Sequence, residues 1–280
     1  MTVRNKTDQY VYNLSMKAIL LSLILLAYSG CTALAVESVP ASEDGQNPAR
    51  TTLLVELFTS EGCSSCPPAE ELLARLEKEQ PFPDAELVTL AFHVDYWDDL
   101  GWKDKFASPL FTQRQKVYDW KFRTGQIYTP QMVIDGDIEL VGSREKDAVK
   151  AIKKSIRNKK ASIELDLNKL ELSISITAIP GHGDSSVYVA LAEDGLSSSI
   201  KRGENAGRNL KHVSVVRELR GVGRVAAANS EFEGTITLSP STDWNSENVK
   251  VVVFVQDNAS RVIHGVSTIP LNVLVKGEDG

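Results

Sequence analysis

The 280-residue sequence has no excess of positive charge and no internal repeat, and each absence argues against a class of protein. Lysine and arginine number 31 against 37 aspartates and glutamates, which gives a formal net charge of −6 at pH 7. A general nucleic-acid binder normally presents a basic face, so this balance argues against one. No internal repeat and no low-complexity tract is present, so the chain is expected to form ordinary globular domains.

A long apolar segment is also missing. The uncharged apolar run at residues 18–27 is too short for a comfortable membrane span of about 20 residues. Ala33 and Ala35 form a small-x-small cleavage site after it, so residues 1–35 are predicted to be a signal peptide. Two alternatives remain, an uncleaved anchor helix and lipidation of Cys31 in a lipoprotein-like box. Contact with a membrane is expected only if Cys31 is lipidated.

Cysteine is scarce, with three residues in the whole chain. Removal of the predicted signal peptide leaves only Cys63 and Cys66. An exported protein with this pair meets an oxidising compartment in which disulfides persist, so we expect a periplasmic or secreted protein. Residues 36–50 are rich in proline, serine, asparagine, glycine and acids, which predicts a linker.

The remaining chain divides into two patterns. Residues 51–160 alternate short apolar runs with helical patterns, which predicts an α/β domain. Residues 161–280 consist of short alternating runs separated by turn residues, which predicts an all-β sandwich-like domain. In the first domain we expect strands near 52–58, 87–94, 132–136 and 139–141, and helices near 69–79, 109–122 and 144–158.

The two cysteines carry the strongest chemical signal. They follow the predicted strand at 52–58, have two residues between them, and precede the predicted helix at 69–79. This arrangement allows a disulfide to form and break reversibly. Unpaired N–H groups at a helix N-terminus favour the thiolate, which is the attacking species in disulfide exchange. Because Cys63 comes first, we expect it to be less covered and more reactive than Cys66.

Two further residues agree with redox chemistry. Pro130 stands directly before a predicted strand, where it can hold a cis peptide beside the cysteine pair, and Thr129 can offer its backbone to an extended substrate. An ordinary trans proline is the alternative. Glu56 lies inside the first strand, where a desolvated carboxylate can relay protons to a buried sulfur. Its alternative is a solvent-facing glutamate at a strand end.

An aromatic and acidic loop follows the second strand, at residues 95–104. Its side chains Tyr96, Trp97 and Trp102 are candidates to shape a substrate groove. His93, just before this loop, is most simply a packed core histidine.

The same cysteines also suggest a metal alternative. Thiolates and imidazole suit copper or zinc, so Cys63, Cys66 and His93 are an alternative soft-metal site.

A basic segment interrupts the second domain at residues 201–213, and its length and polarity predict a loop or hairpin arm. Its basic cluster is expected to receive an anionic partner or to pack onto the redox domain, with a solvated loop as the alternative. The cluster consists of Arg202, Arg208, Lys211, His212 and Arg217.

Three segments of the chain, Phe58 to Ala69, Ala91 to Trp97 and Tyr128 to Gly136, resemble an exported bacterial family, the domain of unknown function 1223. Its members have a thioredoxin-like fold. The resemblance therefore implies a thioredoxin-like α/β domain followed by the all-β sandwich-like domain.

By resemblance to thioredoxins, Cys63 is the attacking cysteine, Cys66 the resolving one and Pro130 the cis-proline. No cofactor is implied, and the partners are protein or small-molecule thiols and disulfides. The dipeptide Ser64-Ser65 and the prolines after Cys66 depart from thioredoxin, so the direction of exchange is open.

The sequence thus favours an exported thiol–disulfide oxidoreductase-like protein. A soft-metal binding protein and an interaction module with a structural disulfide are the alternatives.

Overall fold

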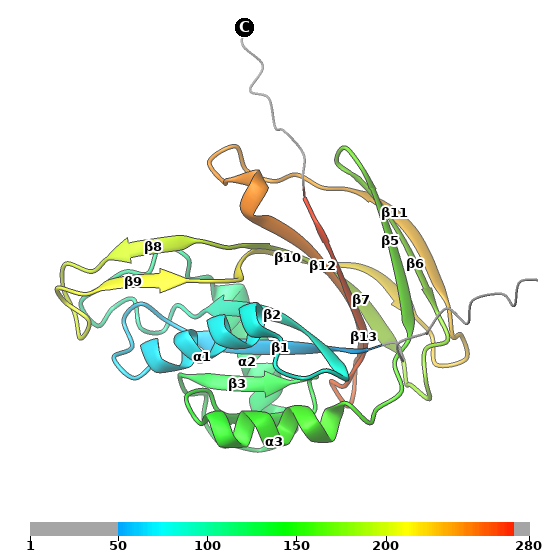
Figure 1. Ribbon diagram of the computed structural model, residues 1–280, viewed down its shortest axis with the longest axis horizontal. Helices are drawn as coiled ribbons and strands as arrows, with labels where there is room; N and C mark the ends of the chain where they lie inside the picture. The colour runs from blue at the N-terminus through cyan, green and yellow to red at the C-terminus, as the bar shows by residue number, and fades with distance from the viewer. Residues whose placement is uncertain (1–49, 272–280) are drawn as a thin grey trace, which may run out of the picture. The chain divides into compact units, whose positions relative to one another are not determined.

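A computed structural model describes residues 50–271 of the chain (Figure 1). The predicted signal peptide, the linker up to residue 49 and Cys31 lie outside the described residues. The fold is mixed α/β, with an eight-stranded mixed sheet and two smaller antiparallel sheets. The strand order in the large sheet is β13-β12-β7-β10-β2-β1-β3-β4.

The elements follow in chain order. The helices are α1 (Pro67–Glu79), α2 (Pro109–Phe122), α3 (Glu145–Ser155) and the short 3₁₀ helix η1 (Ser246–Asn248). The first strands are β1 (Thr51–Thr59), β2 (Ala85–His93), β3 (Gln131–Ile134), β4 (Ile138–Val141), β5 (Ser162–Asn168), β6 (Glu171–Thr177) and β7 (Ser185–Glu193). The later strands are β8 (Leu196–Ser199), β9 (Asn209–His212), β10 (Val215–Val225), β11 (Phe232–Thr237), β12 (Val249–Asp257) and β13 (Ile263–Pro270).

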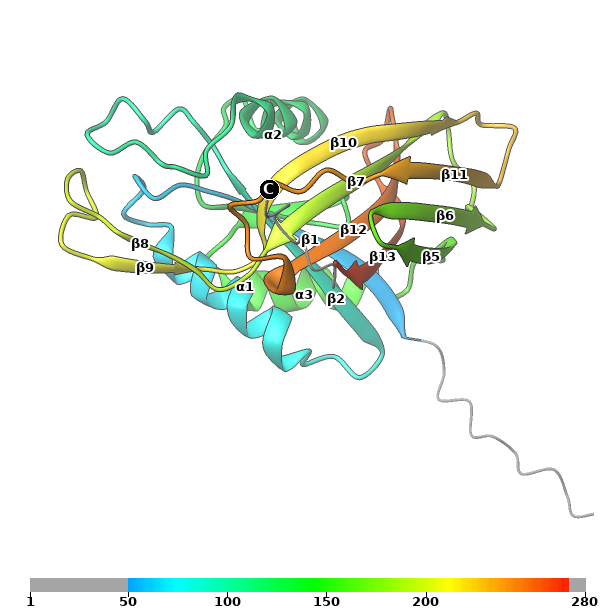
Figure 2. The ribbon, with the colours of Figure 1, turned by 90° about the horizontal axis from the view of Figure 1, so that it is seen from above.

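The strand β1 lies between β2, which is parallel to it, and β3, which is antiparallel. Both faces of β1 are covered, which explains why its apolar run is nearly continuous. Leu53, Val55 and Leu57 pack towards α1 and α3, whereas Leu54 and Phe58 pack towards α2. Figure 2 shows α2 on one side of the sheet and α1 and α3 on the other.

The helix starts follow from capping residues. The hydroxyl of Ser108 accepts a hydrogen bond from the backbone N–H of Leu110, and Pro109 occupies the first helical position, as predicted. Helix α1 begins at Pro67, two residues before the predicted start, because proline is tolerated in the first turn. Both cysteines therefore precede the first helical residue of α1, and Cys66 is its N-cap.

The strands of the second predicted domain continue the sheet of the first. Val215 of β10 pairs with Ala91 of β2, and β7, β12 and β13 extend the sheet beyond β10. The three-stranded sheet β11-β6-β5 packs on this extension through valine, leucine and isoleucine side chains, which resembles a sandwich. One of the two packed sheets is thus shared with the α/β part, and the division into two separate domains stays a prediction.

The basic segment forms the connection within a two-stranded antiparallel hairpin, β8–β9, as one alternative predicted. We call residues 194–214 the arm. In Figures 1 and 2 the hairpin lies beside the loop that joins β1 to α1. Among residues 50–271, no helix combines the length and apolar character that a membrane crossing requires.

Candidate functional site: a covered disulfide beside a buried polar cluster

Cys63 and Cys66 form a disulfide in the turn between β1 and α1. Both cysteines are fully buried. The expectation that Cys63 is less covered than Cys66 is therefore wrong. Ser64 and Ser65, between the two cysteines, are exposed, so the backbone of this turn reaches the surface while the sulfurs do not.

The arm covers this turn. Nδ2 of Asn205 donates to the backbone carbonyls of Glu61 and Cys63, at 2.9 and 3.0 Å. Oε2 of Glu204 accepts from the backbone N–H and the hydroxyl of Ser64, at 3.1 and 2.7 Å. Sequence reasoning anticipated that the arm packs near the cysteines but missed these two residues, which carry no basic charge.

The residues of the predicted basic cluster have other positions, and one of them, Arg217, lies beyond the arm on β10. Arg208 donates to Oδ1 of Asn205 at 3.0 Å and so orients the amide that caps the cysteine turn. Arg202 and Lys211 are exposed. Arg217 pairs with Glu193 and lies over the ring of Trp244. His212 differs from all of them because it is buried.

Five buried side chains form what we call the polar cluster: Glu61, Glu70, His93, Asp104 and His212. They come from the cysteine turn, α1, β2, the loop after β2 and β9. The cluster therefore joins the arm to the α/β part directly beside the disulfide.

Short contacts connect the cluster. Nδ1 of His212 donates to Oε2 of Glu70 at 2.6 Å, and Nε2 of His212 lies 3.4 Å from Oε1 of Glu61. Nδ1 of His93 donates to Oδ2 of Asp104 at 2.7 Å, and the same oxygen accepts the backbone N–H of Glu61 at 2.8 Å. The two imidazole rings are 5.1 Å apart, centre to centre.

Burial and charge compete in setting the pKa values of these groups. Burial lowers the pKa of His212, but its contacts with Glu61 and Glu70 outweigh this effect and raise it to about 9. Burial raises the pKa of Glu61, yet the contact with His212 brings it below its usual value. Burial likewise raises the pKa of Asp104, and His93 more than reverses the shift. The cluster is thus a charged network inside the protein.

The aromatic loop lies against the cysteine turn. Nε1 of Trp102 donates to Oε2 of Glu61 at 2.6 Å, and Nε1 of Trp97 donates to the hydroxyl of Thr129 at 2.8 Å. A Cβ added to Gly62 would lie 3.2 Å from Cβ of Trp97. Both tryptophans are half-buried. Burial raises the pKa of Tyr96, in the same loop, to about 12. The role of these residues in a substrate groove stays a prediction.

The Thr129–Pro130 peptide is cis, as predicted. Pro130 lies close to the start of α1, because a Cβ added to Gly142 would be 3.2 Å from both Cβ of Pro130 and Cβ of Ala69. Ala69 is the third residue after Cys66. The predicted catalytic roles of Pro130 and Thr129 remain predictions.

Glu56 is desolvated, as one of the two alternatives predicted. It is fully buried, so the solvent-facing alternative is wrong. Nε of Arg114 donates to Oε1 at 2.6 Å and the hydroxyl of Tyr118 donates to Oε2. Both carboxylate oxygens thus have partners on α2. Among the described residues, no hydrogen bond or ion pair joins Glu56 to either cysteine, so the contacts give no support to its predicted role as a proton relay.

The residues that are best placed to bind a metal ion also differ from the predicted set of Cys63, Cys66 and His93. In the described part of the chain, ligand atoms of Glu70, His93 and His212 lie within 4.8 Å of one another. His93 belongs to this group, but neither cysteine does. Glu70 is four residues after Cys66, and Glu61 is two residues before Cys63. A search of the sequence for acidic residues near the cysteines would have found both.

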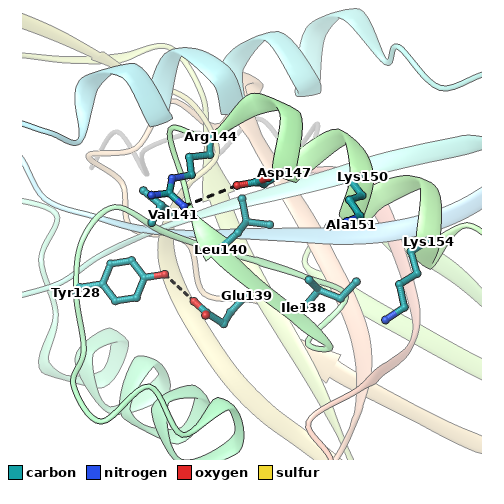
Figure 3. A pocket seen from close by; sticks show the side chains of 10 residues that line it. All are labelled: Tyr128, Ile138, Glu139, Leu140, Val141, Arg144, Asp147, Lys150, Ala151 and Lys154. Atoms are coloured by element: carbon teal, nitrogen blue, oxygen red, sulfur yellow. Dashed lines mark hydrogen bonds and ion pairs between the residues drawn. The ribbon is translucent and has the colours of Figure 1, made fainter.

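A surface hollow of about 450 Å³ lies between β4 and α3 (Figure 3). It is lined by charges of both signs, and Tyr128 donates to Glu139 across it at 2.6 Å. Its lining includes neither the cysteines nor any residue of the polar cluster. The hollow is therefore separate from the disulfide site.

The protein is of the mixed α/β class and has a disulfide between its first strand and its first helix. Residues 54–256 match the family described as protein of unknown function (DUF1223), and the chain belongs to this family.

A thioredoxin from Methanocaldococcus jannaschii is 30% identical over 103 residues, which are 36% of this chain and 94% of the relative. The crystal structure of a protein from Agrobacterium tumefaciens is similar with a TM-score of 0.63 and 29% identity, over 80% of this chain and 96% of that one.

Proposed function

We propose that the protein is an exported thiol–disulfide oxidoreductase of the thioredoxin-like kind. The observation that carries the proposal is the Cys63–Cys66 disulfide at the junction of β1 and α1. The similarity to a thioredoxin over 94% of the relative's length supports it. Export to the periplasm or the medium is inferred from the predicted signal peptide and agrees with a stable disulfide.

In the proposed reaction, the oxidised protein accepts two electrons from a dithiol. A partner thiolate attacks Sγ of Cys63, the Cys63–Cys66 bond breaks, and the released Cys66 thiolate takes up a proton. The second thiolate of the partner then attacks the mixed disulfide, and Cys63 leaves and is protonated. The protein gains two electrons and two protons, and the partner leaves as a disulfide. The reverse sequence oxidises the protein again.

The arm determines which partners can react. Both sulfurs are buried, and Asn205 and Glu204 hold the backbone of the cysteine turn through hydrogen bonds, so we infer that an attacking thiolate reaches Cys63 only when these contacts open. Four hydrogen bonds hold the two residues on the turn. A partner that can displace them is favoured over a small unspecific thiol, so the arm narrows the range of substrates.

A redox titration tests the proposal. The oxidised chain is equilibrated in dithiothreitol or glutathione buffers of graded potential, and free thiols are counted by mass after alkylation. We expect a midpoint in the range of known dithiol proteins, about −270 to −120 mV. The Cys63→Ser/Cys66→Ser variant is the control and should show no transition.

A structural disulfide is the competing candidate, because the full burial of both sulfurs favours it. Under that alternative the bond stays intact in buffers below about −300 mV, whereas an exchanging pair is reduced there. Location is tested separately: the chain expressed with its own N-terminal segment should be recovered outside the cytoplasm and shortened near Ala35.

A further inference from the structure

We propose that Glu70, His93 and His212 bind one divalent transition-metal ion of the zinc type, beside the disulfide and without using either cysteine. The proposal does not rest on the redox function, because it concerns the protein with its disulfide intact. It also differs from a site made by the cysteines with His93, since both sulfurs are committed to each other.

The three side chains come from separate elements and converge in the interior. Glu70 is on α1, His93 ends β2 and His212 ends β9. Their ligand atoms lie within 4.8 Å of one another, and all three residues are buried. Two imidazoles and one carboxylate are a donor set typical of zinc sites, whereas calcium and magnesium favour oxygen donors alone.

The second observation is an unpartnered nitrogen. Nδ1 of His93 donates to Asp104, which leaves Nε2 as the ring nitrogen available to a ligand. This Nε2 is buried and has no hydrogen-bond partner within residues 50–271. A histidine that ligates a metal usually donates its other ring N–H to a carboxylate, as His93 does here, because this fixes the ring and raises its basicity.

The charges of the cluster point the same way. Three carboxylates, of Glu61, Glu70 and Asp104, face only two imidazoles in the polar cluster. Even if both rings were protonated, one negative charge would remain uncompensated in the interior, which is costly. A divalent cation removes this deficit. Oε1 of Glu61 lies 3.4 Å from Nε2 of His212, the ring nitrogen that does not face Glu70.

The geometry requires only small movements. Zinc bonds of about 2.0–2.2 Å place tetrahedral ligand atoms roughly 3.4 Å apart. The 2.6 Å distance between Nδ1 of His212 and Oε2 of Glu70 must increase by less than about 1 Å. The distances of up to 4.8 Å between the other ligand atoms must decrease by a similar or somewhat larger amount. The ion takes the place of the proton between His212 and Glu70, and that proton leaves to solvent. Thr59 donates to the other oxygen of Glu70 at 2.7 Å and holds the carboxylate in position.

Metal binding is tested on the purified, oxidised chain after treatment with a chelator. Zinc chloride is titrated in thiol-free buffer by calorimetry, and we expect saturation at one ion per chain. Glu70→Gln and His93→Gln should each weaken binding by at least about tenfold. Asp104→Asn, which removes the carboxylate that supports His93 and also accepts the backbone N–H of Glu61, should weaken it by about 10–100-fold.

The chain contains its own matched control. Its other two histidines, His182 and His264, also lie close together, with ring centres 5.8 Å apart, but outside the polar cluster. The double variant His182→Gln/His264→Gln should bind zinc as the parent does. Loss of binding in this control, unchanged binding in His93→Gln, or an absence of saturable binding to the oxidised parent would each overturn the proposal.

A measurement on the parent chain avoids the risk that a core variant does not fold. Zinc should shift the ring signals of His93 and His212 in an NMR spectrum and leave those of His182 and His264 in place. The opposite pattern would locate the ion elsewhere and refute the site. Because the disulfide stays intact throughout, failure here leaves the redox proposal standing, and failure of the redox titration does not affect this result.

Discussion

Two buried acidic networks, one beside the middle of β1 and one just after its end, are built in different ways. Glu56, in the middle of β1, is paired with Arg114 and Tyr118, and the guanidinium of Arg114 also lies over four aromatic rings. The polar cluster after the end of β1 has histidines where the first network has arginine. Arginine keeps its charge at all relevant pH values, whereas histidine can exchange a proton for a metal ion.

The comparison separates a fixed network from an adjustable one. Both oxygens of Glu56 have hydrogen-bond partners, as expected where a charge only has to be stabilised. In the polar cluster, Nε2 of His93 lacks a hydrogen-bond partner among the described residues, and Oε1 of Glu61 and Nε2 of His212 have only each other, at 3.4 Å. Buried groups without partners cost free energy, so the polar cluster is expected to stabilise the fold less than the network around Glu56 does.

The largest expected effect comes from breaking the fixed network. Arg114→Met should lower the free energy of unfolding by about 3–5 kcal/mol, because it leaves the Glu56 carboxylate buried without its cation. Urea unfolding followed by fluorescence measures this. The double variant Glu56→Leu/Arg114→Met, which removes both charges, should recover much of the loss. Equal destabilisation in the single and double variants would show that the ion pair is not the cause.

A smaller effect is expected beside the polar cluster, where the arm covers the cysteine turn. Asn205→Ala removes two hydrogen bonds to carbonyls of the cysteine turn, which should cost about 1–3 kcal/mol if the carbonyls stay buried. The disulfide should then be reduced faster by dithiothreitol, measured by quenched alkylation. Asn209→Ala, an exposed change on the same arm, is the matched control. Identical reduction rates in both variants would mean that Asn205 does not cover the sulfurs.

The smallest effect concerns a carboxylate that is held by backbone groups instead of a cation. Burial raises the pKa of Asp257, but backbone N–H donors of Ser260, Gly183 and Ala259 lower it more. A lowered pKa contributes stability above the ordinary value near 3.9, and this contribution is lost as the pH falls through the folded value. Asp257→Asn should therefore lower stability at pH 7 and flatten its loss below pH 4, as seen in acid unfolding curves. An unchanged acid limb would exclude this acid as a contributor.

Local signals predicted much of the fold. The Ser108-Pro109 pair set the start of α2, and the apolar runs placed β1 and β2, because capping and burial act on neighbouring residues. The spacing of the cysteines predicted their bond. The partner of Glu56 was not predictable, because Arg114 is distant in sequence and meets it only through the packing of α2 on the sheet.

The coverage of Cys63 was missed for the same reason. Nothing in the local pattern of Asn205 or His212 indicates that these side chains reach the cysteine turn. Their position depends on the pairing of β10 with β2, which brings the arm beside α1. Asn205, a polar residue in a loop, is thus part of the site because of the order of the strands.

The arm leaves and re-enters the sheet at two adjacent positions. Glu193 at the end of β7 pairs with Val215 at the start of β10, so the arm is a loop whose two ends are neighbouring residues in the sheet. The ends of such a loop are already held together, and doubling its length costs only about 0.6 kcal/mol in closure entropy. A longer or shorter arm would therefore leave the strand pairing at its base intact. The fold attaches the cap over the cysteine turn at one position of the sheet, so the proposed control of access to the disulfide depends on residues inserted at a single point.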